Sequence, residues 1–259
     1  MSRASRLVAF VLSGVLLLGT AALADEIKVV TSGAFTAAYL DIIPGFERAT
    51  HHTITTVYGA SMGSTPTSIP NRLDRGEPLD VVILADTALD ALIRAGKVVA
   101  GSRVDLVRSR IGMAVRTGAP KPDISTVAAL TRTLLAAKSV AFSDSASGVY
   151  ISTELLQRLG IADRILPKSR KIQSEPVGAV VARGEAEIGF QQISELQPEK
   201  GIDVVGPLPA DVQKITVFSA GIVAGAKSPD AARALITYLA SPAAAAAITK
   251  AGLEPASAR

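Results

Sequence analysis

The residues best suited to chemistry in this sequence lie in three turns that are rich in small and hydroxyl-bearing side chains. These turns are residues 31–36 (TSGAFT), 59–68 (GASMGSTPTS) and 143–150 (SDSASGVY), and a helical pattern follows each of them. The first N–H groups of a helix have no partner within the helix and attract anions. Around one ligand, the three turns would form a neutral site for an oxyanion or a carboxylate. Taken singly, each serine also fits an ordinary capping or turn role.

Two adjacent amides end a predicted strand in the segment EIGFQQISEL, residues 187–196. Gln191 and Gln192 would lie at the carboxyl edge of a sheet, which is the usual ligand side of open α/β folds. An amide both donates and accepts hydrogen bonds, so this pair could bind carboxylates or hydroxyls. The alternative is that both amides face solvent at the end of the strand.

Other catalytic and metal-binding patterns find no support in the sequence. The chain has no Cys, and its two histidines are the neighbours His51 and His52, which would face opposite ways in a strand. No H-x-x-x-H or Walker-type spacing occurs. Residues 59–63 (GASMG) match G-x-S-x-G, but the histidine that serves this motif follows the serine in the chain, and here both histidines precede Ser61. We therefore expect no metal site, no cofactor and no serine nucleophile.

The first 24 residues have the pattern of a secretory signal peptide. Arg3 and Arg6 precede an apolar run that ends in Ala-Leu-Ala at residues 22–24. We expect cleavage before Asp25 and a mature protein free in the periplasm, with a retained membrane anchor as the alternative. Loss of the two arginines lowers the formal net charge from +4 to +2, which is too weak a balance to indicate a nucleic-acid partner.

Short β-rich runs alternate with helical stretches along the mature chain. The predicted strands are residues 27–31, 53–59, 79–86, 110–116, 139–144, 187–192 and 215–225. The predicted helices are residues 35–49, 87–95, 125–137, 148–159, 177–183, 229–239 and 242–251, with the end of a short helix at 71–76. Ser125 is the expected N-cap of the helix over 125–137. This order predicts an α/β protein with two lobes and mostly parallel strands.

Four longer segments stand out beyond these patterns, namely VVTSGAFTAAYLDIIPGFERAT, LDRGEPLDVVILAD, GVYISTELLQRLGI and YLASPAAAAAITKAGLEP. Together they resemble the molybdate-binding-like family of class II periplasmic solute-binding proteins, over essentially the whole mature chain. The resemblance implies the type II fold of two Rossmann-like α/β lobes with an anion in the interlobe cleft. It implies crossovers near 105–110 and 215–220, with lobe 1 formed by residues 25–108 and 218–259 and lobe 2 by residues 109–217.

The same resemblance implies a set of ligand-binding residues. Ser32, Gly33, Ala34 and Phe35 would hold one side of the anion with Ser61 and Ser64, and Ser145, Ser147 and Gly148 would close the other side. Gln191 and Gln192 would test the shape of the ligand, and the backbone N–H groups of Ala85 and Val177 would add donors. Ala34 stands where molybdate binders of the family carry Ser, and Gln192 falls near a family Tyr. These departures favour an anion larger than molybdate.

Two functions follow from the resemblance. The first is a monomeric solute-binding protein that captures a small anion and delivers it to the permease of an ABC importer. The second arises because proteins with the Gln-Gln-x-Ser-Glu-Leu segment are similar to aconitate isomerase, an exported enzyme on this fold. That reaction needs an acid/base group near neutral pKa. The candidates are Tyr39, Tyr58, Asp86, Asp144 and Glu195, with Arg72 as a possible clamp for a substrate carboxylate.

Overall fold

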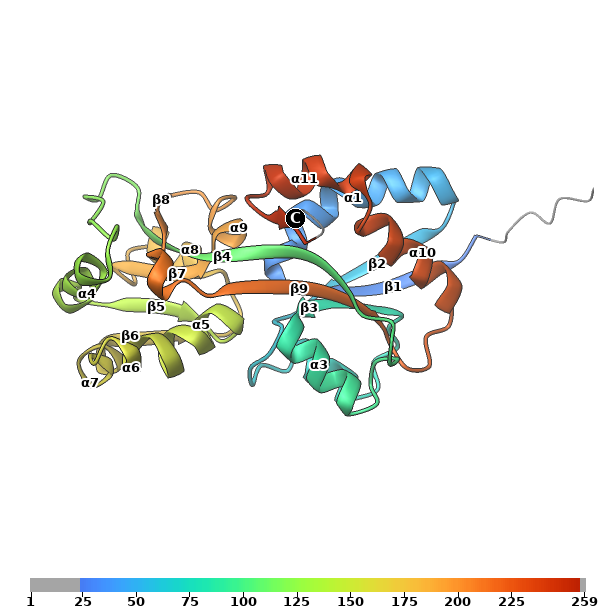
Figure 1. Ribbon diagram of the computed structural model, residues 1–259, viewed down its shortest axis with the longest axis horizontal. Coiled ribbons are helices and arrows are strands. Elements are labelled where there is room, and N and C mark those ends of the chain that lie inside the picture. The colour runs from blue at the N-terminus through green and yellow to red at the C-terminus, as the bar shows by residue number, and fades with distance from the viewer. Residues whose placement is uncertain (1–23, 257–259) are drawn as a thin grey trace, which may run out of the picture.

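The computed structural model describes residues 24–256. The predicted signal peptide, residues 1–24, lies outside this range except for Ala24. The described chain forms two α/β bodies side by side, and two long strands, β4 (Val104–Arg116) and β9 (Ile215–Ile222), run between them (Figure 1). The predicted α/β class with two lobes is confirmed.

The first body, lobe 1, is built on a core of residues from 27–107 and 218–253. Its other strands are β1 (Glu26–Thr31), β2 (Thr53–Tyr58), β3 (Val81–Ala85) and β10 (Glu254–Pro255). Its helices are α1 (Gly33–Thr50), α2 (Ile69–Asp74), α3 (Asp86–Arg94), α10 (Pro229–Leu239), η4 (Pro242–Ala244) and α11 (Ala245–Lys250).

The second body, lobe 2, is built on a core of residues from 111–212. Its strands are β5 (Val140–Ser143), β6 (Ser169–Ile172), β7 (Ile188–Gln192) and β8 (Ile202–Pro207), together with the second half of β4. Its helices are α4 (Val127–Ala136), α5 (Ala146–Tyr150), η1 (Ile151–Leu155), α6 (Leu156–Arg158), α7 (Ala162–Ile165), η2 (Leu166–Lys168), α8 (Val177–Ala182), α9 (Ile193–Leu196) and η3 (Ala210–Val212). The predicted boundaries between the lobes, after residues 108 and 217, stay a prediction.

The sheet runs through both lobes in the strand order β2-β1-β3-β9-β4-β7-β5-β6, with β8 and β10 also paired to β4. The parallel pairings are β1 with β2 and β3, and β5 with β6 and β7. All pairings of β4 and β9 are antiparallel. The prediction of mostly parallel strands is therefore wrong for the middle of the sheet, because the two strands that cross between the lobes run in opposite directions.

Alternation along the strands of lobe 1 explains why helices cover both faces of its sheet. Val81 and Ile83 of β3 pack with α1, α10 and α11, whereas Val82 and Leu84 pack with α2 and α3. Successive side chains of a strand point to opposite faces, so a wholly apolar strand such as β3 requires cover on both. The helices leave uncovered the end of the sheet where β1 and β3 have their carboxyl ends, together with the turns that follow these strands.

Two local features differ from the sequence-based expectation. The helix α4 is capped by Thr126, whose Oγ1 accepts a hydrogen bond from the Ala129 N–H at 3.1 Å, and Ser125 lies one residue before the cap. The helix after β5 begins at Ala146, two residues before the predicted start, and turns into the π-helical η1 at Ile151. Both shifts are small, as is usual for helix ends, whose capping residue is decided by local geometry.

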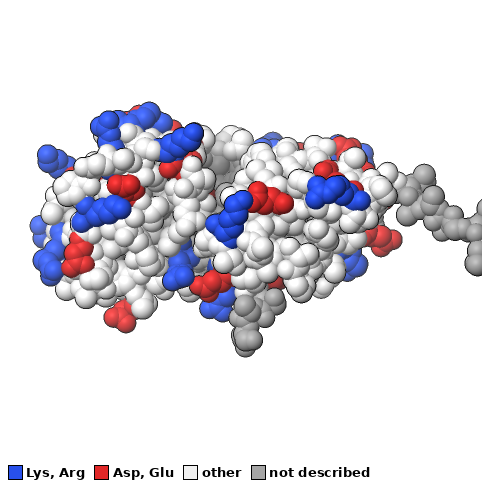
Figure 2. All heavy atoms as spheres, turned by 90° about the horizontal axis from the view of Figure 1, so that it is seen from above, with Lys and Arg blue, Asp and Glu red and all other residues white. Residues whose placement is uncertain are grey.

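Charges of both signs are mixed over the face seen in Figure 2, where Lys and Arg alternate with Asp and Glu on both halves. Among residues 24–256, no single helix is both long and apolar enough to cross a membrane; one pair of helices, Pro229–Leu239 with Pro242–Lys250, reaches the length but is bent by 58°.

Candidate functional site

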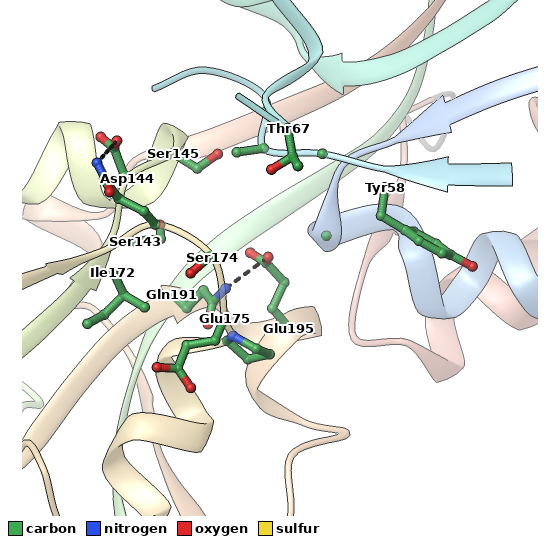
Figure 3. A pocket seen from close by; sticks show the side chains of 15 residues that line it. Tyr58, Thr67, Ser143, Asp144, Ser145, Ile172, Ser174, Glu175, Gln191 and Glu195 are labelled. Carbon is green, nitrogen blue, oxygen red and sulfur yellow. Dashed lines mark hydrogen bonds between the residues drawn. The ribbon is translucent and has the colours of Figure 1, made fainter. Parts of the chain in front are cut away.

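A cleft of about 280 Å³ lies between the two lobes (Figure 3). Lobe 1 lines it with Gly33, Tyr58, Gly59, Ala60 and Thr67, and lobe 2 lines it with Ser143, Asp144, Ser145, residues 172–176, Gln191 and Glu195. These residues follow the carboxyl ends of β1 and β2 in one lobe and of β5, β6 and β7 in the other. The carboxyl edge of a sheet is where ligands bind in open α/β folds.

A smaller recess of about 10 Å³ lies beside this cleft and shares Gly33, Ser145 and Glu195 with it. Its further lining is Ser32, Ala34, Ser61, Ala146, Ser147, Gln192 and Phe218. This volume is room for about one water molecule. Small and hydroxyl-bearing residues from both lobes thus meet in one place.

Two side chains of the recess carry buried polar atoms without a hydrogen-bond partner among the described residues, Ser32 Oγ and Gln192 Oε1. Ser32 and Gln192 are only 2% and 1% exposed. The other end of the Gln192 amide donates to Thr216 Oγ1 at 3.2 Å, and because a hydroxyl can donate or accept, turning the amide would still leave one atom unpaired. Unpaired buried polar atoms are costly, and a water molecule or one polar atom of a ligand in the recess would satisfy them.

Glu195 is the carboxyl group at the junction of the cleft and the recess. It lies in the first turn of α9, and its carboxylate accepts from Gln191 Nε2 at 2.9 Å and from the Gln192 backbone N–H. The residue keeps a partial exposure toward the cleft, but protein encloses the carboxylate on its other sides. This loss of solvation raises the pKa of Glu195 to about 7, against the lowering effect of the two hydrogen bonds.

The Gln191 side chain holds Glu195 in a defined orientation. Gln191 Oε1 accepts from the Val177 N–H at the start of α8 at 2.9 Å. With its oxygen engaged in this way, the amide directs Nε2 toward Glu195 (Figure 3). Gln191 is 6% exposed, so its amide belongs to the wall of the cleft and is not free in solvent.

Asp144 connects the two lobes across the cleft. Its Oδ2 accepts from the N–H and the hydroxyl of Ser64, both at 3.2 Å, and its Oδ1 lies 3.2 Å from Lys171 Nζ. Gln173 Nε2 donates to Ser64 Oγ at 3.0 Å and to Asp144 Oδ2 at 3.3 Å. Burial by itself would raise the pKa of Asp144, but the bond from Ser64, the Lys171 cation and Gln173 outweigh it and hold this pKa below its usual range.

Most of the residues predicted to bind the ligand line the cleft or the recess. They are Ser32, Gly33, Ala34, Ser61, Ser145, Ser147, Gln191 and Gln192. Phe35, Ser64, Ala85, Gly148 and Val177 lie outside both linings. The Ala85 N–H donates to Ser61 Oγ at 2.9 Å and the Val177 N–H to Gln191, so protein atoms satisfy both predicted backbone donors. Gly148 is needed for packing, because a Cβ there would collide with the Ser143 carbonyl oxygen.

The structure separates the acid/base candidates into two groups. Tyr58, Asp144 and Glu195 line the cleft. Tyr39, a residue of α1, is fully buried with its hydroxyl 2.9 Å from Thr56 Oγ1, and burial raises its pKa. Asp86 Oδ1 accepts from the Thr87 N–H at 2.7 Å and does not line the cleft.

Arg72 does not line the cleft either. Its guanidinium donates to both oxygens of Glu77, at 2.7 and 2.9 Å, and to the backbone carbonyls of Tyr58 and Thr67. With these donors engaged, Arg72 holds the loop that follows β2 in place. The predicted clamp for a substrate carboxylate therefore has no support at Arg72.

Sequence reasoning missed the loop Gln173-Ser174-Glu175-Pro176, which forms one wall of the cleft. A signal was present, because the polar run KIQSEP follows the end of β6 in the same way that the predicted turns follow β1 and β5. Its position at the carboxyl edge only becomes apparent once β6 pairs in parallel with β5. The strand over 169–172 is short and polar, so periodicity does not reveal it.

Comparison with known proteins shows which family this chain belongs to. A family model described as bacterial extracellular solute-binding protein matches residues 27–254. The chain belongs to this family. Family members bind solutes outside the cytoplasm, and the two-lobed α/β structure with a cleft at the strand ends is the type II fold expected of it.

Individual relatives within and around the family differ in what they do. The aconitate isomerase of a Pseudomonas species is 49% identical over 254 residues, covering 96% of this chain and 97% of that protein. The molybdate-binding protein ModA of Azotobacter vinelandii is 29% identical and covers 92% of each chain. The solved periplasmic molybdate-binding protein of Azotobacter vinelandii superposes with a TM-score of 0.70 at 22% identity, covering 88% of this chain and 98% of that one. The predicted resemblance to molybdate-binding-like proteins is confirmed.

Proposed function

We propose that the protein interconverts the cis and trans isomers of a small unsaturated tricarboxylic acid such as aconitate, with Glu195 as the group that removes and returns the proton. The observation that carries this proposal is the position of Glu195, a carboxyl group in the wall of the interlobe cleft that Gln191 holds at 2.9 Å and that has no cationic partner among the described residues. Its burial also raises its pKa to about 7. A general base works best when its pKa is near the operating pH. The identity of 49% with an aconitate isomerase supports the same reaction.

The proposed chemistry needs no reactant besides the substrate and one carboxyl group. Glu195 removes a proton from the CH₂ group that lies α to a carboxylate, and the electron pair spreads over the neighbouring double bond. The same carboxyl then returns the proton to the former vinylic carbon, and the double bond moves to the other pair of carbons. The CH₂ and CH groups exchange places, so the connectivity is unchanged and only the geometry of the new double bond can differ.

The remaining residues of the site have roles in binding and positioning in this proposal. Ser32, Ser61 and the N–H groups at the start of α1 offer neutral donors to a carboxylate. Gln191 fixes the direction of the Glu195 carboxyl, since its own oxygen is engaged by Val177. The contacts of Asp144 with Ser64 hold the lobes together around the substrate, and we propose that the lobes separate for exchange.

The proposal also includes export of the protein to the periplasm. We infer that the signal peptide is cleaved before Asp25 and that the mature chain acts as a monomer in the periplasm. The family and the periplasmic molybdate-binding relative support this location.

A second candidate function is capture of a small anion for an ABC importer. It is favoured by the recess itself, where buried and unpaired atoms of Ser32 and Gln192 are suited to a bound ligand without any chemistry. In this reading the ligand would be held by the predicted set of residues and closure of the lobes would present it to a permease. Glu195 would then contribute only to binding.

One experiment separates the two functions. Mature protein is incubated with cis-aconitate and with trans-aconitate while ultraviolet absorbance and thermal stabilisation are followed, alongside the Glu195→Gln variant. The proposal expects turnover in proportion to protein, and a loss of about 10²–10⁴-fold in kcat for the variant. Stabilisation by either isomer without turnover would make the protein a binding protein, and turnover that survives in Glu195→Gln would remove Glu195 from the chemistry.

A further inference from the structure

The Glu195 carboxylate lies against the first residue of α1 although it belongs to the other lobe. A Cβ added to Gly33 would collide with Glu195 Oε1, so the absence of a side chain at position 33 allows this approach. The helix α1 has 18 residues, and the unpaired N–H groups at its start favour negative charge. A carboxylate of the protein therefore lies where an incoming anion would find the strongest attraction.

The charges around the cleft single out Glu195. Among residues 24–256, three carboxyl side chains and no Lys or Arg line the cleft. Asp144 is paired with Lys171, and Glu175 with Arg183 at 2.9 Å. Glu195 has only neutral hydrogen-bond donors around it and forms no ion pair with any residue in the range 24–256.

The space beside Glu195 is also limited. The recess has a volume of about 10 Å³, which is room for about one water molecule, whereas a tetrahedral oxyanion has four oxygen atoms around a central atom. Its serines and helix N–H groups would otherwise suit such an ion, and Ser32 Oγ is buried and unpaired there. Removal of the Glu195 side chain would enlarge this space and withdraw a negative charge at the same time.

We propose that Glu195 is a selectivity residue whose carboxylate occupies the anion position at the start of α1 and thereby excludes small inorganic oxyanions such as molybdate and sulfate. A tetrahedral dianion entering the recess meets a like charge and a filled volume. An organic acid avoids both obstacles, because it presents a C–H group to Glu195 and places its carboxylates toward the neutral donors of either lobe. The choice of an organic acid as the accepted ligand rests on the proposed function, whereas the exclusion of oxyanions does not.

The test measures molybdate and sulfate binding by calorimetry on mature wild-type protein and on two variants. Glu195→Gln removes the charge and keeps the volume, and Glu195→Ala removes both. We expect at least tenfold tighter binding of molybdate or sulfate to Glu195→Ala than to wild type, with Glu195→Gln in between. Glu154→Gln is the control, since it removes a carboxylate that lies outside the cleft and has Lys214 as its partner, and we expect a change of less than twofold.

The outcomes distinguish this inference from the proposed function. Wild-type protein that binds either oxyanion as tightly as Glu195→Ala overturns the inference, and so do folded variants that gain no oxyanion affinity. Turnover of aconitate is measured on the same wild-type preparation. A gain in oxyanion affinity in the variants, without aconitate turnover by wild type, supports the selectivity role of Glu195 and rejects the isomerase function. Aconitate turnover by wild type, without a gain in oxyanion affinity in the variants, supports the isomerase function and rejects the selectivity role.

Discussion

The two walls of the interlobe cleft differ in chemistry although both lie at the carboxyl ends of strands. Lobe 1 contributes Ser32, Gly33, Ala34 and Ser61, which offer hydroxyl and backbone N–H donors without charge. Lobe 2 contributes amides and carboxyl groups as well, with Glu195 as its central member. On the proposed function, lobe 1 supplies neutral donors for an anion, and the charged and amide groups of lobe 2 select the ligand and act on it.

The two walls also differ in how their residues are held. The polar atoms of lobe 2 form a chain of contacts from the Val177 N–H through Gln191 to Glu195. Ser32 in lobe 1 is instead buried with an unpaired hydroxyl. A network of satisfied groups keeps a reactive carboxyl in place, whereas unpaired donors are available to a ligand.

The largest effect is expected from Gly33→Ala, which breaks the contact between the two walls. Gly33 has no positive φ and starts a helix, so Ala suits its backbone and the fold should keep its thermal stability. The new Cβ displaces the Glu195 carboxylate, and kcat/KM for aconitate should fall about 100-fold, because a misplacement of about 1 Å can cost that much. Kinetics and melting temperature measure the two effects separately, and normal activity in a folded variant would show that Glu195 does not act at this position.

A smaller effect is expected from Gln191→Met, which removes the donor that favours ionised Glu195. The pKa of Glu195 should rise above about 7, because the lost hydrogen bond had lowered it. Since the base must be ionised, the acidic limb of the kcat/KM profile should move to higher pH, and activity at pH 7 should fall about tenfold.

The matched control for Gln191→Met is Gln213→Met. The Gln213 amide also bonds to backbone, with the Ile111 N–H and carbonyl both at 2.9 Å, but it lies outside the cleft. Gln213→Met should lower the stability of the protein about as much as Gln191→Met does, and it should leave the pH profile of kcat/KM unchanged. Titration of the Glu195 carboxyl carbon by nuclear magnetic resonance measures the change in the Glu195 pKa independently of enzyme activity. A titration midpoint that is unchanged in Gln191→Met would contradict the positioning role of Gln191.

A pair of serine variants tests the platform of lobe 1. Ser32→Ala removes an unpaired hydroxyl, so we expect KM to rise about five- to tenfold, with the free energy of unfolding within about 0.5 kcal/mol of wild type. Ser61→Ala leaves the buried Ala85 N–H without its acceptor and should cost about 1–3 kcal/mol of stability. Chemical denaturation and kinetics on both variants provide the comparison. Equal stability losses would contradict the distinction between the unpaired hydroxyl of Ser32 and the hydroxyl of Ser61, which also accepts from a buried N–H.

The smallest effect is expected from Asp144→Asn at the contact between the lobes. The variant loses the attraction to Lys171 but can still accept from Ser64, so aconitate affinity should weaken only about two- to fivefold. Calorimetry measures the affinity, and small-angle scattering reports whether the lobes open. Glu154→Gln, which removes an exposed ion pair with Lys214, is the control and should change neither measurement. A fall in kcat/KM for aconitate as large as the fall expected for Gly33→Ala would instead give Asp144 a direct role in the chemistry.

Much of the architecture could be predicted because its signals are local. Apolar runs such as VVILA at residues 81–85 indicate buried strands, and small residues at 31–36 and 143–150 indicate the turns that line the cleft. The antiparallel pairing of β4 and β9 was missed, because the direction in which a strand runs depends on where the chain returns from the other lobe. The wall at residues 173–176 was missed because the strand before it is short and polar.

By itself, the sequence determined the α/β class, the order of the elements and the positions of the donor-rich turns, since these depend on neighbours within a few residues. It offered Tyr39, Tyr58, Asp86, Asp144 and Glu195 alike as acid/base candidates, and Arg72 as a clamp for a carboxylate. Only the tertiary structure gave these candidates different surroundings: Arg72 is paired with Glu77 and Tyr39 is buried. Asp144 is paired with Lys171, and Glu195 lies against Gly33 of the other lobe. The physical reason is that a pKa and a charge partner depend on solvation and on groups close in space, and in this protein those groups come from distant parts of the chain.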